Sequence, residues 1–162
     1  MREFCRIFRA GSNRLIDLGS TAVSICLVAT LLLVTPQWAE AVNYTVCPAP
    51  GDCDFETPDA AVNNEGIADG DIIDITPETY VLGAPMQVFN SITINGNGSI
   101  LDANGDRALE VSGEAADVTV NDVTIFNAQS PGESSGGAIS VTGGANLILN
   151  GSTVENSSAD DS

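Results

Sequence analysis

Histidine and lysine are absent from this sequence, and aromatic side chains are scarce. All five basic residues are arginines, and aromatic residues make up 5% of the chain. Because there is no histidine to act as a base, a Ser-His or Cys-His catalytic pair is excluded. The missing histidines also disfavour a zinc site, since the cysteines would need further ligands to complete it.

Positive charge is nearly absent beyond the start of the chain. Four of the five arginines and three of the 22 acidic residues precede residue 42. Residues 42–162 therefore hold 19 carboxylates and one basic residue, Arg107, and carry a formal charge of −18. Such a surface repels nucleic acid and anionic lipid headgroups, so we expect no nucleic-acid partner. Three explanations of the acidity stay open: a solvated exterior, divalent-cation binding, and adaptation to high salt.

Residues 1–41 have the pattern of a secretory signal peptide. Arginines at positions 2–14 form a positive region, Thr21–Val34 is an almost wholly apolar stretch of 14 residues, and Ala39-Glu40-Ala41 is a small-x-small cleavage site. The apolar stretch is shorter than the roughly 20 residues that a spanning helix needs. We therefore predict a secreted or cell-surface protein, in the outer membrane or outside the cell, with no spanning segment in the mature chain.

Cys47 and Cys53 are the cysteines that remain after cleavage, and they flank Pro-Ala-Pro-Gly-Asp. Exported chains fold in oxidising compartments, which favours a disulfide between them. This bridge would close a small loop near the start of the mature chain.

Two pairs of segments in the second half of the chain repeat one another. Asp117–Asn127 matches Asn146–Asn156 at an offset of 29, and Ala108–Gly113 returns as Ala138–Gly143 at an offset of 30. A fixed period in this range indicates a solenoid.

The periodicity within each unit selects the type of solenoid. Aliphatic residues alternate with others at Ile92/Ile94, Val118/Val120 and Leu147/Leu149, which is the pattern of strands with one buried face. The buried positions are mostly Val and Ile between Gly, Asn and Asp turns, unlike the frame of leucine-rich repeats. The sequence therefore predicts an all-β fold, a parallel β-helix.

An asparagine follows each aliphatic triplet, at Asn95, Asn121 and Asn150. Asparagine tolerates the left-handed backbone conformation of a corner, and stacked amides can form a hydrogen-bonded ladder. We interpret this row as part of the scaffold.

The mature chain divides into an N-terminal segment and a series of coils. In residues 42–70 we expect the Cys loop and a short capping helix, with Thr57 as its N-cap and Pro58 in the first turn. Residues 71–162 form the coils, of which the last is cut short. Because a solenoid needs a terminal cap, we expect further coils beyond Ser162.

The repeat motifs resemble those of a known group of proteins. Gly136–Val141 (Gly-Gly-Ala-Ile-Ser-Val) and Leu147–Asn156 look like the repeats of polymorphic outer-membrane proteins and related right-handed parallel β-helix proteins. The resemblance implies a right-handed coil and a surface role in which the partner is a carbohydrate or another cell-surface protein.

The first coil adds to this resemblance. Cys53–Val62, Gly70–Ile73 and Pro77–Tyr80 are similar to the opening of pectin-lyase-like domains, although Glu78 stands where that turn usually has glycine. One superfamily holds adhesins, autotransporter passengers and polysaccharide-cleaving enzymes, so the resemblance bears on fold more than on activity.

Few residues could carry the chemistry of the enzymes in this group. A pectate-lyase-like site implies a calcium ion and a basic residue, for which Arg107 is the one mature candidate. A hydrolase needs two nearby carboxylates, and Asp71 and Asp74 are close enough in sequence, but in a strand they point to opposite faces. We therefore favour an exported non-enzymatic scaffold that displays loops at the cell surface, adhesin-like or structural. The alternative is the N-terminal part of a polysaccharide-cleaving enzyme, a lyase or a glycoside hydrolase.

A cofactor is not expected, apart from calcium, which stays open. Asp102, Asn104 and Asp106 have the spacing of the first half of a calcium loop, but Arg107 and Gly113 stand where an EF-hand has glycine and glutamate. Turn formation explains the same residues.

Overall fold

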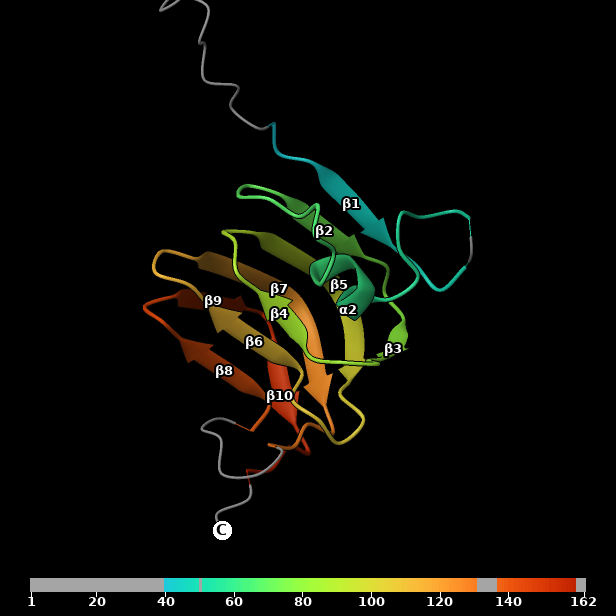
Figure 1. The fold of residues 1–162 in the computed structure, drawn as a ribbon. Coiled ribbons are helices and arrows are strands. Elements are labelled where there is room, and N and C mark those ends of the chain that lie inside the picture. The colour runs from blue at the N-terminus through green and yellow to red at the C-terminus, as the bar shows by residue number, and fades with distance from the viewer. Residues whose placement is uncertain (1–39, 50, 131–136, 160–162) are drawn as a thin grey trace, which may run out of the picture. The chain divides into compact units, whose positions relative to one another are not determined.

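Ten strands and one short helix form the described part of the chain (Figure 1). The computed structural model describes residues 40–49, 51–130 and 137–159, and the predicted signal peptide lies almost wholly outside them. The strands are β1 (Asn43–Val46), β2 (Ile72–Ile75), β3 (Thr79–Val81), β4 (Met86–Val88), β5 (Thr93–Asp102), β6 (Leu109–Ser112), β7 (Asp117–Phe126), β8 (Ile139–Thr142), β9 (Asn146–Asn150) and β10 (Thr153–Glu155), and the helix is α2 (Pro58–Val62). No helix among these residues is long and apolar enough to cross a membrane.

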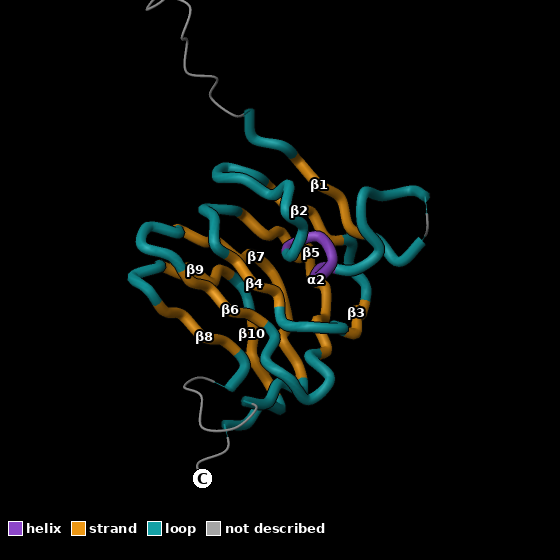
Figure 2. The backbone as a smooth tube through the Cα atoms, in the orientation of Figure 1, coloured by secondary structure: helices purple, strands orange, loops and turns teal. Residues whose placement is uncertain are grey.

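The strands pair in parallel and stack into the coils of a solenoid. One sheet runs β1-β2-β5-β7-β10, with β3 also on β5 and β9 also on β7, and the other runs β4-β6-β8. Each of β5 and β7 turns a corner, so its first half pairs with one set of neighbours and its second half with another. Figure 2 shows the strands following one another along each coil with loops between them. The parallel β-solenoid predicted from the sequence is thus confirmed, with about four turns and almost no helix.

The register changes at the corner inside β5. Asn95 pairs with Asn121, an offset of 26, but Ser99 pairs with Val123, an offset of 24. The β5 corner therefore contains two residues more than the β7 corner. Gly96 sits at this bulge, where an added Cβ would lie 2.6 Å from the backbone oxygen of Asp122, so no side chain fits there.

Aliphatic side chains of successive coils stack in the interior. Ile73, Ile94 and Val120 occupy one column and are at most 2% exposed. Each such side chain contributes about 2 kcal/mol relative to an exposed one, so the columns stabilise the stack of coils.

At the last coil, three of these interior columns end in partly exposed side chains. Val120, Ile125 and Val111 are at most 2% exposed. Their partners in the next coil, Leu149, Val154 and Val141, are 41%, 42% and 43% exposed. In the described residues nothing lies over these side chains or along the outer edges of β8, β9 and β10. Within the part of the chain that the structure describes, this end of the solenoid is an apolar surface with unpaired strand edges.

The stack begins earlier than the sequence indicated. Strand β1 pairs in register with β2, so residues 42–70 contain a strand of the solenoid as well as the loop and helix expected there. The outer edge of β1 is occupied by Phe55: its N–H donates to the carbonyl of Thr45, and its carbonyl accepts from the N–H of Cys47, each at 3.1 Å. Tyr44 packs edge-on against the Phe55 ring.

Helix α2 lies beside the edge of β4. Thr57 has an extended backbone and accepts a hydrogen bond from the N–H of Ala60, as an N-cap does. At the other end, the Asn63 side chain accepts from the N–H of Gln87 at 2.7 Å and donates to the carbonyl of Pro85 at 3.0 Å. These bonds occupy the backbone groups that a preceding coil would otherwise pair.

Candidate functional site

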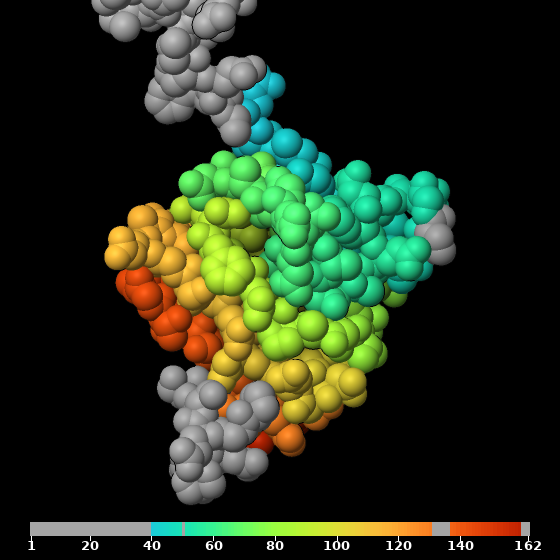
Figure 3. Space-filling view, in the orientation of Figure 1, coloured from blue at the N-terminus to red at the C-terminus, as the bar shows by residue number. Residues whose placement is uncertain are grey.

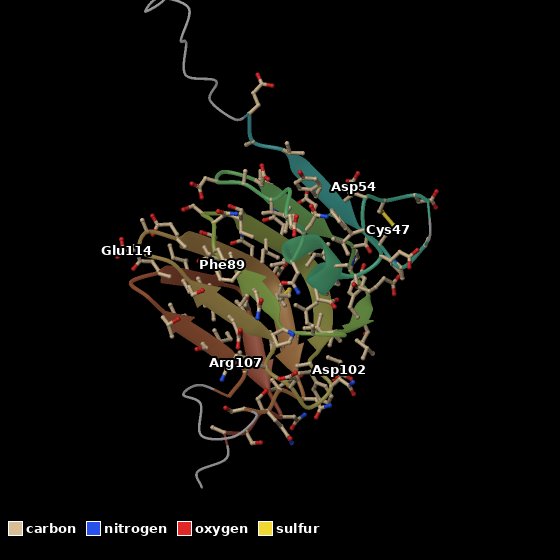
Figure 4. All side chains as sticks on the ribbon, viewed as in Figure 1. Cys47, Asp54, Phe89, Asp102, Arg107 and Glu114 are labelled. Carbon is tan, nitrogen blue, oxygen red and sulfur yellow. A yellow bond between two sulfur atoms is a disulfide. The ribbon has the colours of Figure 1, made fainter. Side chains whose placement is uncertain are left out.

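The Cys loop is closed by a disulfide between Cys47 and Cys53. Its short closed loop turns the chain back so that Asp54 and Phe55 reach β1 (Figure 4). The exposed Asp54 carboxylate accepts from the N–H of Thr45 at 2.8 Å and from its hydroxyl at 2.9 Å. Because both bonds favour the charged carboxylate, the pKa of Asp54 is lowered from its ordinary value of 3.8.

Asn95, Asn121 and Asn150 form a continuous ladder of side-chain amides. The amide nitrogen of Asn121 donates to the oxygen of Asn95, and that of Asn150 to Asn121, both at 2.9 Å. Asp74 adds a rung below, accepting from Asn95 at 2.7 Å and from Asn43 at 2.9 Å. These amide bonds join each coil to the next.

The conformational reason given for these asparagines is wrong. None of the three has a positive φ. Instead, the left-handed residues at this corner are Asn97 (φ 53°), Asp122 (φ 57°) and Gly151 (φ 60°). The ladder asparagines are extended, because their backbones still pair with the neighbouring strands. The corner itself begins at the following residues.

Asp102 is the last residue of β5, and Asn104 and Asp106 lie in the turn that follows. The carboxylate of Asp102 accepts from the N–H of Asn104 at 2.9 Å and from the side chain of Asn127 at 3.1 Å. Asp106 accepts from the N–H of Arg107 at 2.7 Å. No group of three His, Cys, Asp or Glu side chains that could hold a metal occurs in the described ranges. The bonds from the backbone of Asn104 and Arg107 are those of turn formation, and the bond from Asn127 joins two successive coils.

Arg107 is 7% exposed and forms a salt bridge with Glu110. Its guanidinium also contacts the hydroxyl of Ser130 at 3.4 Å. A guanidinium held in this way is largely removed from solvent. Its contacts link the turn to β6.

Asp71 and Asp74 both have structural partners. Asp71 is 1% exposed and accepts from the N–H groups of Val42 and Ala68, each at 2.8 Å. Asp74 belongs to the ladder. The two carboxylates therefore accept hydrogen bonds from groups in and beside the first coil. They are not arranged as a general acid and its partner.

A cavity of about 360 Å³ opens where the chain after α2 meets the chain after β4. We name it the Phe89 pocket. It is lined by residues 62–65, 67, 87–90 and 92. The buried Val62, Ile67, Val88 and Ile92 form an apolar floor. Figure 3 shows the hollow between the green residues after α2 and the yellow-green residues after β4.

The rim of the Phe89 pocket is polar except for Phe89. The Phe89 side chain is 65% exposed because the alternation of β4 directs Met86 and Val88 inward. Asn64, Glu65, Gln87 and Asn90 complete the rim. In Figure 4 Phe89 lies well away from Asp102 and Arg107. The volume of the Phe89 pocket falls within the roughly 300–1,000 Å³ typical of small-molecule sites.

No family model, no curated protein and no solved structure matches this chain. The solenoid is therefore established by the strand pairings themselves, and a function has to be argued from the geometry.

No pattern in the sequence pointed to the Phe89 pocket. Its walls come from two segments about two dozen residues apart, and no pattern in the sequence links the one segment to the other. An aromatic residue continuing the outward phase of a strand, as Phe89 does, is the one signal that could have pointed to it.

Proposed function

We propose that this chain is an exported, non-enzymatic β-helix that displays loops at the cell surface, as an adhesin-like or structural module. One observation carries the proposal: the patterned polar side chains are used to hold coils together. Arg107, Asp71 and Asp74, the residues considered as catalytic candidates, all have structural partners: Arg107 pairs with Glu110, Asp71 accepts from Val42, and Asp74 belongs to the asparagine ladder.

The fold and the targeting pattern support the same role. Residues 1–41 have the features of a signal peptide, and the motifs at Gly136–Val141 and Leu147–Asn156 resemble right-handed, pectin-lyase-like and polymorphic outer-membrane repeats. A formal charge of −18 over residues 42–162 suits a solvated exterior facing the outside of a cell.

Further coils beyond Ser162 are part of this proposal. Leu149, Val154 and Val141 are partly exposed, and no described strand pairs with the outer edges of β8, β9 and β10. Both observations support the proposal, because an additional coil would pair those edges and bury those side chains.

The display role is tested by following the full chain in a host that exports it. We expect the mature protein to begin at Val42, to be degraded when intact cells are treated with protease, and to stay inside when Leu32→Arg interrupts the apolar stretch. Recovery of the unmodified chain only from the cytoplasm would contradict the proposal. Turnover of an acidic polysaccharide with calcium that is lost on changing one aspartate would instead favour the lyase alternative.

A further inference from the structure

We propose that the Phe89 pocket binds a neutral saccharide unit, with one face of the sugar ring stacked on Phe89. The inference goes beyond the display role, because it concerns a site on the purified chain and holds whether or not the chain reaches a cell surface.

The Phe89 ring supplies the stacking surface. A pyranose has an apolar face of C–H groups and a polar edge of hydroxyls, and an aromatic ring packs against the first while leaving the second free. Phe89 is 65% exposed, so its ring is available without any rearrangement of the core. The apolar floor of Val62, Ile67 and Val88 continues this surface inward.

Polar atoms on the rim are available for the hydroxyl groups. Asn90 donates through its nitrogen to the carbonyl of Ile67 at 2.7 Å, and Asn64 accepts through its oxygen from the N–H of Gly66 at 2.8 Å. Each amide keeps a second polar atom, Asn90 Oδ1 and Asn64 Nδ2, without a partner among the described residues. Together they offer one acceptor and one donor, which is the pairing that a hydroxyl uses.

The pocket is held open by bonds that do not involve a ligand. Asn63 ties the end of α2 to Gln87 and Pro85, and Asn90 ties the end of β4 to Ile67. A site whose walls are already fixed loses little conformational entropy on binding, which favours even a small ligand.

Charge selects a neutral sugar over an acidic one. Glu65 lies on the rim, and no basic residue lines the pocket. A uronate or a phosphorylated sugar would therefore meet a charge of its own sign. A cation would be attracted, but a single ring and a single carboxylate form only part of a cation cage, whereas the free amide atoms match hydroxyl groups.

The test titrates the full chain with neutral methyl hexopyranosides and their short oligomers. Oligogalacturonate serves as the anionic comparison and tetramethylammonium as the cationic one. We expect saturable binding of a neutral sugar that competes with neither comparison compound. Phe89→Ala should weaken it about tenfold, by loss of the aromatic contact, and Phe89→Tyr should retain it.

Val81→Ala is the matched control, since Val81 is also an exposed apolar residue, 57% accessible, but lies on β3 outside the pocket. Thermal unfolding of each variant checks that the fold is intact. The proposal is overturned if no neutral sugar binds saturably, if Val81→Ala weakens binding as much as Phe89→Ala, or if either comparison compound binds more tightly. Failure of export in the earlier experiment would leave this outcome unaffected.

Discussion

Asn121 lies directly above Asn95 in the next coil, and its amide nitrogen donates to the Asn95 oxygen at 2.9 Å. Because the Asn121 oxygen in turn accepts from Asn150, one side chain joins three successive coils. The register between coils is therefore set by these side-chain bonds as well as by backbone pairing.

Replacing this central rung should be costly. Asn121→Ala leaves the Asn95 oxygen without its donor and the Asn150 nitrogen without its acceptor, so we expect a loss of about 1–2 kcal/mol in the free energy of unfolding. Asn150→Ala removes one ladder bond at the exposed end and should cost less. Chemical denaturation measures both, with Thr119→Ala on the same strand as the control. Equal losses in all three variants would exclude a specific contribution from the ladder.

Opening the Cys loop should destabilise the start of the solenoid. A double Cys47→Ser, Cys53→Ser variant frees a short loop, for which the entropic model gives about 2 kcal/mol. Hydrogen exchange should accelerate at the N–H groups of Cys47 and Phe55, which bond across this loop. Reductant should affect the parent protein and leave the variant unchanged. Unaltered exchange at Phe55 would mean that its pairing with β1 does not depend on the bridge.

Asp54 predicts a pH dependence of stability with a definite sign. Its folded-state pKa is lowered by the bonds from Thr45, so its contribution is present above the unfolded pKa and is lost as the pH falls through the folded one. The difference in unfolding free energy between the parent and Asp54→Asn should be constant near neutral pH and shrink below about pH 4. A parent–Asp54→Asn difference that grows in acid would contradict the assignment.

Two leucines at interior positions should respond differently to truncation. Leu101 is fully buried in β5, whereas Leu149 is 41% exposed in β9. Leu101→Ala should cost about 2–5 kcal/mol, and Leu149→Ala less than about 1.5 kcal/mol, because a half-exposed side chain leaves no closed cavity. Denaturation of both variants provides the comparison. A large loss at Leu149 would mean that its surface is covered in solution.

The periodic part of the fold could be predicted from the sequence with little ambiguity. Repeats at an offset of 29 and strict alternation at Val118, Val120, Leu147 and Leu149 specify strands that stack on their own copies. Strand β1 could not be found in this way, because Asn43–Val46 resembles no later unit and its place is decided by pairing with β2.

The polar sites were predicted less completely. The ladder followed from three asparagines at equivalent positions, but its rung at Asp74 is a different residue type and only its distance to Asn95 identifies it. Arg107 could be named as the one mature base, whereas its burial beside Glu110 depends on how the turn folds back over β6.

The sequence by itself determined the coil: short-range alternation and a fixed repeat length leave a parallel stack as the way to bury every aliphatic face. Only the tertiary structure decided the ends and the pocket. Contacts between segments that share no pattern decide three features: the exposure of Leu149 in the last described coil, the pairing of Phe55 with β1, and the surroundings of Phe89. Such contacts are set by packing in three dimensions, which local periodicity does not encode.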